Sequence, residues 1–149
     1  MKDDIIVLLL FLAFVVFIIL FCYKGYKRAS AVKKANSNTA QRVGATQNAT
    51  LKHISGLPIA KGVLVEVFYG PEKIVFKKDG EEIVVARNKI TSIDLASKAA
   101  ITQNLVISYT SDNKNKQITL DTYINGLFAL NIQKDFKKNN SNKQNTIEL

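Results

Sequence analysis

Few residues of this chain could take part in acid, base or nucleophilic chemistry, and none has the partners that such chemistry requires. The one histidine, His53, has no Asp or Glu near it in the sequence, so it lacks the orienting carboxylate of a nucleophilic triad. Glu81 and Glu82 form a carboxylate pair, but neighbours in a strand point to opposite faces of a sheet, and Lys77 and Lys78 are simple cross-strand partners. We therefore expect no catalytic residue and no enzymatic activity.

Metal and cofactor sites are not expected either. Asp112 begins the loop DNKNK, whose two lysines would repel a cation, and the glycine and final glutamate of a calcium-binding loop are missing. One cysteine, Cys22, and one histidine are too few for a cysteine-based zinc site or a histidine cluster. The chain also has no glycine-rich phosphate loop. The sequence therefore predicts no bound metal and no cofactor.

An uninterrupted apolar run is the clearest feature of the sequence. From Ile5 to Cys22 there is no charge, glycine or proline. As a helix this run would be roughly 27 Å long, close to the ~30 Å hydrocarbon thickness of a bilayer. A cleaved signal or lipoprotein signal fits less well, because the start MKDD is not basic and Phe21 precedes the cysteine. The run predicts a single transmembrane helix with Ile5, Leu12, Phe17 and Cys22 in the bilayer.

The basic residues are concentrated just after this run. The net charge is +9, and no acidic residue lies between Asp4 and Glu66. The positive-inside rule then predicts a single-pass protein of the cell membrane, with the N-terminus outside and the C-terminal domain in the cytoplasm. Nucleic acid is not an expected partner, because no aromatic residues are interleaved with the basic ones beyond Tyr26. The residues expected to contact anionic lipid at the membrane surface are Lys24, Lys27, Arg28, Lys33 and Lys34.

Changes in composition divide the chain into four parts. Residues 1–28 are the expected transmembrane anchor with its basic flank. Residues 29–52 are rich in Ala, Asn, Ser, Thr and Gln and are expected to be a flexible basic linker. Residues 53–138 contain the apolar patterning of one small domain, and residues 139–149 are expected to be a disordered polar tail.

Within the domain, the periodicity of apolar residues predicts strands followed by one helix. Asp79-Gly80 is a strong hairpin signal, because both residues tolerate the positive φ of a type I′ turn. Residues 96–102 fit either a short strand or a helical turn. Alternation predicts strands over residues 62–69, 72–78, 81–87, 89–95, 104–111 and 117–121. In the fourth of these, Ile93 and Leu95 are expected to face inward. The period then changes to 3.6, and the apolar stripe of the predicted amphipathic helix contains Ile124, Leu127, Phe128, Ile132 and Phe136.

Six or seven antiparallel strands and a C-terminal amphipathic helix follow the order of the pleckstrin-homology-like (PH-like) superfold. The segments HISGLPIAKG, KITSIDL, LVISYTSD and KQITLD resemble small PH-like domains of low-GC Gram-positive bacteria and their phages. The resemblance implies an α+β fold in which an antiparallel β-barrel or sandwich is closed by that helix, here behind a transmembrane helix. It also implies a binding scaffold that uses a sheet edge or a helix groove. The phosphoinositide-binding members carry a long basic loop where this chain has only Gly70-Pro71 followed by Glu72, so an inositol-phosphate pocket is not expected.

These observations favour a non-enzymatic adaptor that presents a cytoplasmic PH-like module to a protein or peptide partner at the membrane. One alternative is an oligomerising scaffold of a membrane assembly, in which the chain is a homo-oligomer. Another is a domain displayed on the outer side of the membrane. The sequence does not identify the partner.

Overall fold

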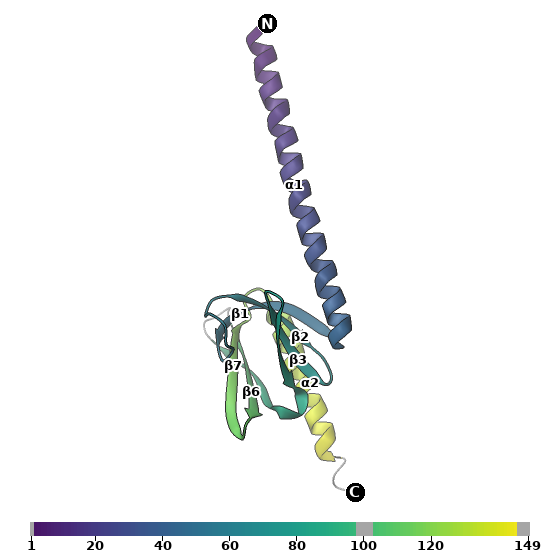
Figure 1. The fold of residues 1–149 in the computed structure, drawn as a ribbon, viewed down its shortest axis with the longest axis vertical. Coiled ribbons are helices and arrows are strands. Elements are labelled where there is room, and N and C mark those ends of the chain that lie inside the picture. Colours follow the sequence, from purple (N-terminus) through teal and green to yellow (C-terminus); the bar gives the residue numbers. More distant parts are fainter. Residues whose placement is uncertain (1, 98–102, 146–149) are drawn as a thin grey trace. The chain divides into compact units, whose positions relative to one another are not determined.

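The computed structural model describes residues 2–97 and 103–145, apart from the side chains of residues 2–10, 28–29 and 142–145. The chain divides into two compact units, Met1–Thr39 and Ala40–Leu149. The long helix α1 (Lys2–Val43) supplies the whole of the first unit and ends inside the second. The second unit contains the sheet and the C-terminal helix (Figure 1).

The structure corrects the prediction for the N-terminal segment. In the part of the chain that the structure describes, no helix combines the length and the apolar character needed to cross a membrane. The predicted transmembrane helix is therefore wrong, and so are the single-pass membrane localisation and the orientation that depended on it. Leu12, Phe17 and Cys22 are exposed residues of α1.

The second unit is an α+β fold built on one antiparallel sheet of seven strands. The spatial order is β4-β3-β2-β1-β7-β6-β5, so β4 and β5 are the two end strands. The strands are β1 (Gln47–Ser55), β2 (Leu64–Tyr69), β3 (Lys73–Lys78), β4 (Glu81–Ala86), β5 (Ile90–Ser97), β6 (Gln103–Ser111) and β7 (Lys114–Asp121). The helix α2 (Gly126–Asn145) follows the last strand. This architecture is compatible with a PH-like fold.

The connection between β4 and β5 shows that the sheet is strongly curved. These strands are consecutive in the sequence but lie at opposite ends of the sheet. Only the 3-10 turn η1 (Arg87–Lys89) joins them. Because three residues cannot span seven strands of a flat sheet, the sheet must curl until its two ends approach each other at η1. Figure 1 shows the resulting barrel-like shape of the sheet, with α2 beside it.

The concave side of the sheet holds the main hydrophobic core. Every strand contributes at least one large apolar side chain that is buried or packed against it, among them Leu51, Phe76, Ile107 and Leu120. Helix α2 covers this core with Phe128, Ala129, Ile132 and Phe136, which recur on one face of the helix. At Gly56 the backbone approaches β7 so closely that an added Cβ would lie 2.0 Å from the Gln117 carbonyl oxygen. The fold therefore requires a glycine at this position.

A second, smaller hydrophobic cluster fixes the end of α1 to the outer face of the sheet. Val43 of α1 packs with Phe68 of β2 and Val75 of β3. The helix ends in a Schellman motif: Gly44 has φ +68°, and the Ala45 N–H donates to the Ala40 carbonyl at 2.8 Å. The last turn of α1 is thus an integral part of the second unit.

The structure differs from the predicted pattern at both ends of the domain. Residues 29–52, which we expected to be a flexible linker, are helical to Val43 and form β1 from Gln47. Helix α2 continues to Asn145, into the expected tail. Ile124 and Leu127 of the predicted apolar stripe are 82% and 77% exposed, because α2 begins only at Gly126 and its buried face starts at Phe128. Part of the ambiguous segment 96–102 lies outside the described residues.

Candidate functional site

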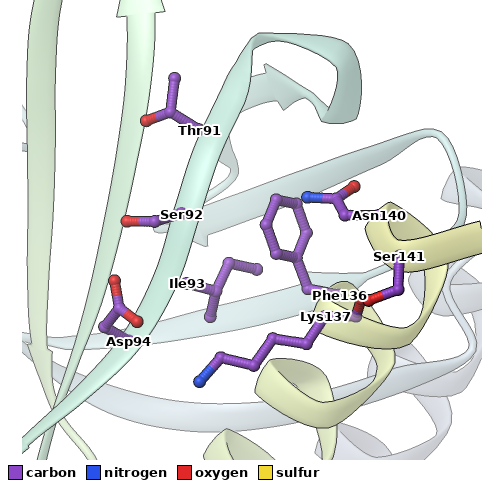
Figure 2. A pocket seen from close by; sticks show the side chains of 8 residues that line it. All are labelled: Thr91, Ser92, Ile93, Asp94, Phe136, Lys137, Asn140 and Ser141. Carbon is purple, nitrogen blue, oxygen red and sulfur yellow. Dashed lines mark hydrogen bonds between the residues drawn. The ribbon is translucent and has the colours of Figure 1, made fainter. Parts of the chain in front are cut away.

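A groove between the end strand β5 and helix α2 is the candidate site considered first. Its volume is about 600 Å³. Figure 2 shows Ile93 of β5 facing the Phe136 ring of α2, with Lys137 and Asn140 on the helix wall. Ser92 and Asp94 point to the other side of the strand. The groove thus has an apolar floor and polar sides, and one of its walls is the edge of a sheet.

The floor of the groove is a fixed surface. Ile93 is 1% exposed and Phe136 is 4% exposed, so both are held by the main core. By contrast, Lys137, Asn140 and Asp94 are exposed, and none of the three makes an ion pair or side-chain hydrogen bond within the described residues. The groove therefore combines a fixed apolar floor, of which little is exposed, with the helix side chains Lys137 and Asn140, while Asp94 lies across the strand from it.

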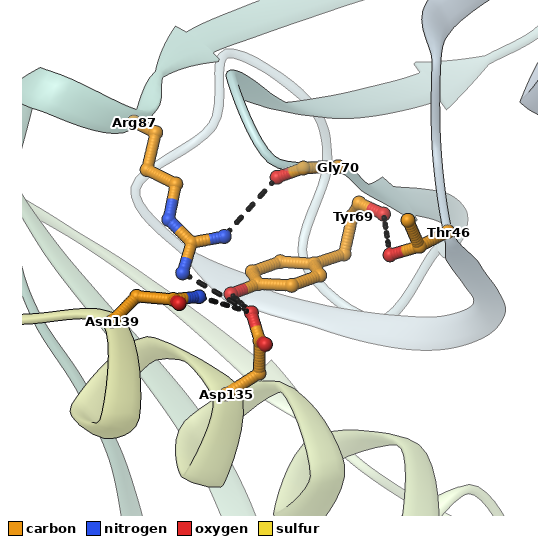
Figure 3. Close-up of polar contacts among 6 residues, drawn as sticks. All are labelled: Thr46, Tyr69, Gly70, Arg87, Asp135 and Asn139. Atoms are coloured by element: carbon orange, nitrogen blue, oxygen red, sulfur yellow. Dashed lines mark hydrogen bonds and ion pairs between the residues drawn. The ribbon is translucent and has the colours of Figure 1, made fainter.

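A polar cluster next to the groove sets the position of α2 (Figure 3). One carboxylate oxygen of Asp135, Oδ2, accepts three hydrogen bonds. They come from the Tyr69 hydroxyl at 2.7 Å, the Arg87 guanidinium at 3.1 Å and the Asn139 amide at 3.1 Å. Tyr69 lies on β2 and Arg87 on η1. These hydrogen bonds therefore connect α2 both to the sheet and to the turn between β4 and β5. Because Phe136 directly follows Asp135, the cluster also positions the floor of the groove.

Arg87 links this cluster to the aromatic residues beneath it. Its guanidinium carbon lies 4.9 Å from the centre of the Tyr69 ring and 5.5 Å from the centre of the Phe136 ring. It also donates to the Gly70 carbonyl at 3.3 Å. These cation–π contacts and hydrogen bonds hold a positive charge over two aromatic faces. Arg87 therefore contributes to both the polar cluster and the underside of the groove.

The electrostatics of the cluster keep Asp135 ionised. The hydrogen bond from the Tyr69 hydroxyl, supported by Arg87, lowers the pKa of Asp135 below its usual range. Burial and the bond to this carboxylate raise the pKa of Tyr69 well above that of a free tyrosine. Tyr69 is therefore a neutral donor and Asp135 a charged acceptor over the ordinary pH range.

A second hollow continues from the groove along α2. It has a volume of about 540 Å³ and shares Asn140 with the first. Its other lining residues include Pro71 and Glu72 from the turn before β3, and Asn88 of η1. The two hollows therefore meet at Asn140 on the surface of α2.

The residues predicted for lipid contact do not line this site. Lys24, Lys27, Lys33 and Lys34 are exposed residues of α1 in the first unit, and the side chain of Arg28 lies outside the described residues, as does that of Ile5. Their expected role at a membrane surface depended on the transmembrane helix, which the structure does not support.

The residues weighed for chemistry are scattered over the second unit. His53 is 3% exposed, with Nδ1 3.1 Å from the Ala60 carbonyl and Nε2 accepting the Leu57 N–H at 3.2 Å. Both ring nitrogens are thus used by the loop that follows β1. Glu82 pairs with Arg42 on the outer face. Among the described residues, no group of three or more His, Cys, Asp or Glu side chains could hold a metal ion.

No protein-family model matches the chain, and no curated protein matches it.

The sequence did not single out Arg87, Asp135 or the groove itself. Ile93 and Phe136 were predicted to face the core, and the structure confirms this. Arg87 and Asp135 are 48 residues apart, and nothing in the local pattern of either predicts that they meet. The one available signal was weak: an arginine directly after a strand and an aspartate on a helix next to a core phenylalanine.

Proposed function

We propose that the second unit is a non-enzymatic binding module that takes an extended segment of a partner protein alongside β5. The observation that carries this proposal is the open edge of β5. Among the described strands, β5 pairs only with β6, and the groove with α2 lies along it. Main-chain groups on the open side of an end strand can pair with an added strand, and a neighbouring helix can supply contacts to its side chains.

The chemistry of the groove supports a peptide rather than a small charged ligand. Its floor is apolar and rigid, and its polar groups are spread along the walls instead of converging on one point. We also propose that the unit is a small PH-like domain of the bacterial and phage type, since the strand order and the C-terminal helix agree with that superfold. Sheet edges and helix grooves are the surfaces on which such a scaffold would bind a peptide.

Blocking the groove tests the proposal. The full chain is used to select binders from a random twelve-residue peptide library displayed on phage, and the affinity of the selected peptides is measured by fluorescence anisotropy. Asn140→Trp places an indole where the two hollows meet and should weaken binding about tenfold or more. Lys138→Trp is the matched control: it adds the same side chain at an exposed position on α2 that lines neither hollow.

Three results would contradict the proposal. The first is a library that yields no binder to the full chain, and the second is equal loss of affinity in the two tryptophan variants. The third is a chain that pairs only with its own copies in sedimentation analysis, since this result favours an oligomerising scaffold instead.

A further inference from the structure

The alternation of side chains along β5 determines which ligand residues would meet which wall. Ile93 faces the groove and its neighbours Ser92 and Asp94 face the other side of the sheet (Figure 2). A strand added beside β5 must alternate in the same way. The ligand residue opposite Ile93 therefore lies on the α2 side, beside Phe136, and the ligand residue opposite Asp94 lies on the outer face.

Among the described residues of β5 and β6, none on the outer face next to Asp94 carries a positive charge. On β6, Asp94 is paired with Val106, and the diagonal neighbours on the same face are Asn104 and Ser108. On β5 itself, the neighbours on this face are Ser92 and Ala96. Asp94 makes no ion pair or side-chain hydrogen bond within the described residues. Its exposed carboxylate is thus free to pair with a charge on an added strand.

From this placement we infer that the module recognises an apolar residue and an adjacent basic residue in the bound segment. The apolar residue pairs with Ile93 and sits over Phe136, where it is shielded from water by α2. The basic residue, Lys or Arg, lies opposite Asp94 on the added strand and forms an ion pair with it. Opposite charges directly across two antiparallel strands attract, and like charges repel. This inference rests on the proposed function and names the peptide that the same groove would select.

The test exchanges charges between the ligand and β5. A peptide selected on the full chain is made in two forms. They carry Lys or Glu at the position next to the apolar residue that pairs with Ile93. The wild-type chain should prefer the Lys form by about 3- to 5-fold, the size of a cross-strand charge pair. Asp94→Lys should reverse the preference, and Asp94→Asn should bring the ratio close to one. Asp112→Lys is the matched control, because Asp112 is an exposed aspartate in the β6–β7 turn and outside the groove lining.

The outcomes separate this inference from the proposed function. If the Lys preference survives in Asp94→Lys while Asn140→Trp still abolishes binding, the groove binds peptides but Asp94 does not select them, and the inference is overturned. If Asp94→Lys and Asp112→Lys change the ratio equally, the effect is net charge alone, which also overturns it. If no peptide binds the full chain, the proposed function itself fails.

Discussion

The two end strands of the sheet differ in what lies beside them. β5 has helix α2 along it and a groove with an apolar floor. β4 begins with Glu81 and Glu82, both exposed, and Glu82 pairs with Arg42. Charged residues on an end strand oppose pairing with another chain. The two edges therefore differ in kind: α2 supplies side chains beside β5, whereas the carboxylates of β4 oppose pairing with another strand.

Truncating the floor of the groove should lower the free energy of unfolding far more than truncating a residue of β4, and this is the largest effect we expect. Phe136→Ala deletes a buried ring that contacts the main core and lies beneath Arg87, so the free energy of unfolding should fall by about 3–5 kcal/mol. Val84→Ala on β4 truncates a side chain that is 54% exposed, so its cost should stay below about 1 kcal/mol. Urea unfolding followed by circular dichroism measures both values. Similar losses of stability in the two variants would mean that the packing of Phe136 does not hold α2 against the core.

Releasing the polar cluster should have a smaller effect that depends on pH. Asp135 has a lowered pKa in the folded chain, so its ionised form stabilises the fold above the pKa of the unfolded chain, ~3.9. This stabilisation disappears as the pH falls from about 4 through the folded pKa. Asp135→Asn should therefore lose about 1 kcal/mol of stability at neutral pH and show a flatter dependence on pH below about 4.

Stability measured between pH 2 and pH 7 tests this prediction. The control is Asp112→Asn, since Asp112 also has a lowered pKa, from bonds to Ser111 and Lys116, but is fully exposed to solvent. Its variant should change stability less than Asp135→Asn does. An acid profile of Asp135→Asn identical to that of the wild type would show that the bonds from Tyr69 and Arg87 do not hold α2 in place.

The smallest effect is expected where the charges of β4 are removed. Glu81→Thr combined with Glu82→Thr leaves the strand backbone intact but removes both carboxylates from the open edge. The variant should associate weakly, visible as a rise in mass on multi-angle light scattering as its concentration increases. Glu72→Thr with Asp112→Thr, which removes two exposed carboxylates outside β4, is the control for lost charge. Equal association in the two double variants would assign the effect to net charge and not to the edge.

The strands of the second unit could largely be predicted from the sequence because their signals are local. The Asp79-Gly80 hairpin is confirmed, with φ +50° and +90° at the two residues, between β3 and β4. β1 was missed because Gln47 to Thr50 are polar or small, and only Leu51 and Ile54 of its nine residues are large aliphatic side chains. This central strand therefore looks like a linker in the sequence, although β2 and β7 pair with it on both sides.

The candidate site could not be predicted, since it depends on contacts between distant parts of the chain. The alternation in β5 correctly predicted an inward Ile93, and the 3.6 period correctly predicted an inward Phe136. Their meeting across a groove requires α2 to lie beside β5, which the Asp135 cluster and the curvature of the sheet determine. Ile124 of the predicted stripe lies before the helix for a related reason: the Thr122 hydroxyl and N–H both donate to the Gln103 carbonyl, which holds the chain in a turn until α2 begins at Gly126.

The central position of β1 has a consequence for how the protein is made. Its two partners are β2, which follows it closely, and β7, which ends at Asp121. During synthesis on a ribosome, the first four strands can pair as they emerge, but the sheet cannot close across β1 until β7 has left the exit tunnel. Helix α2 emerges later still. The groove is thus the last feature to form, so under the proposed function a nascent chain could not bind a peptide before its own sheet is complete.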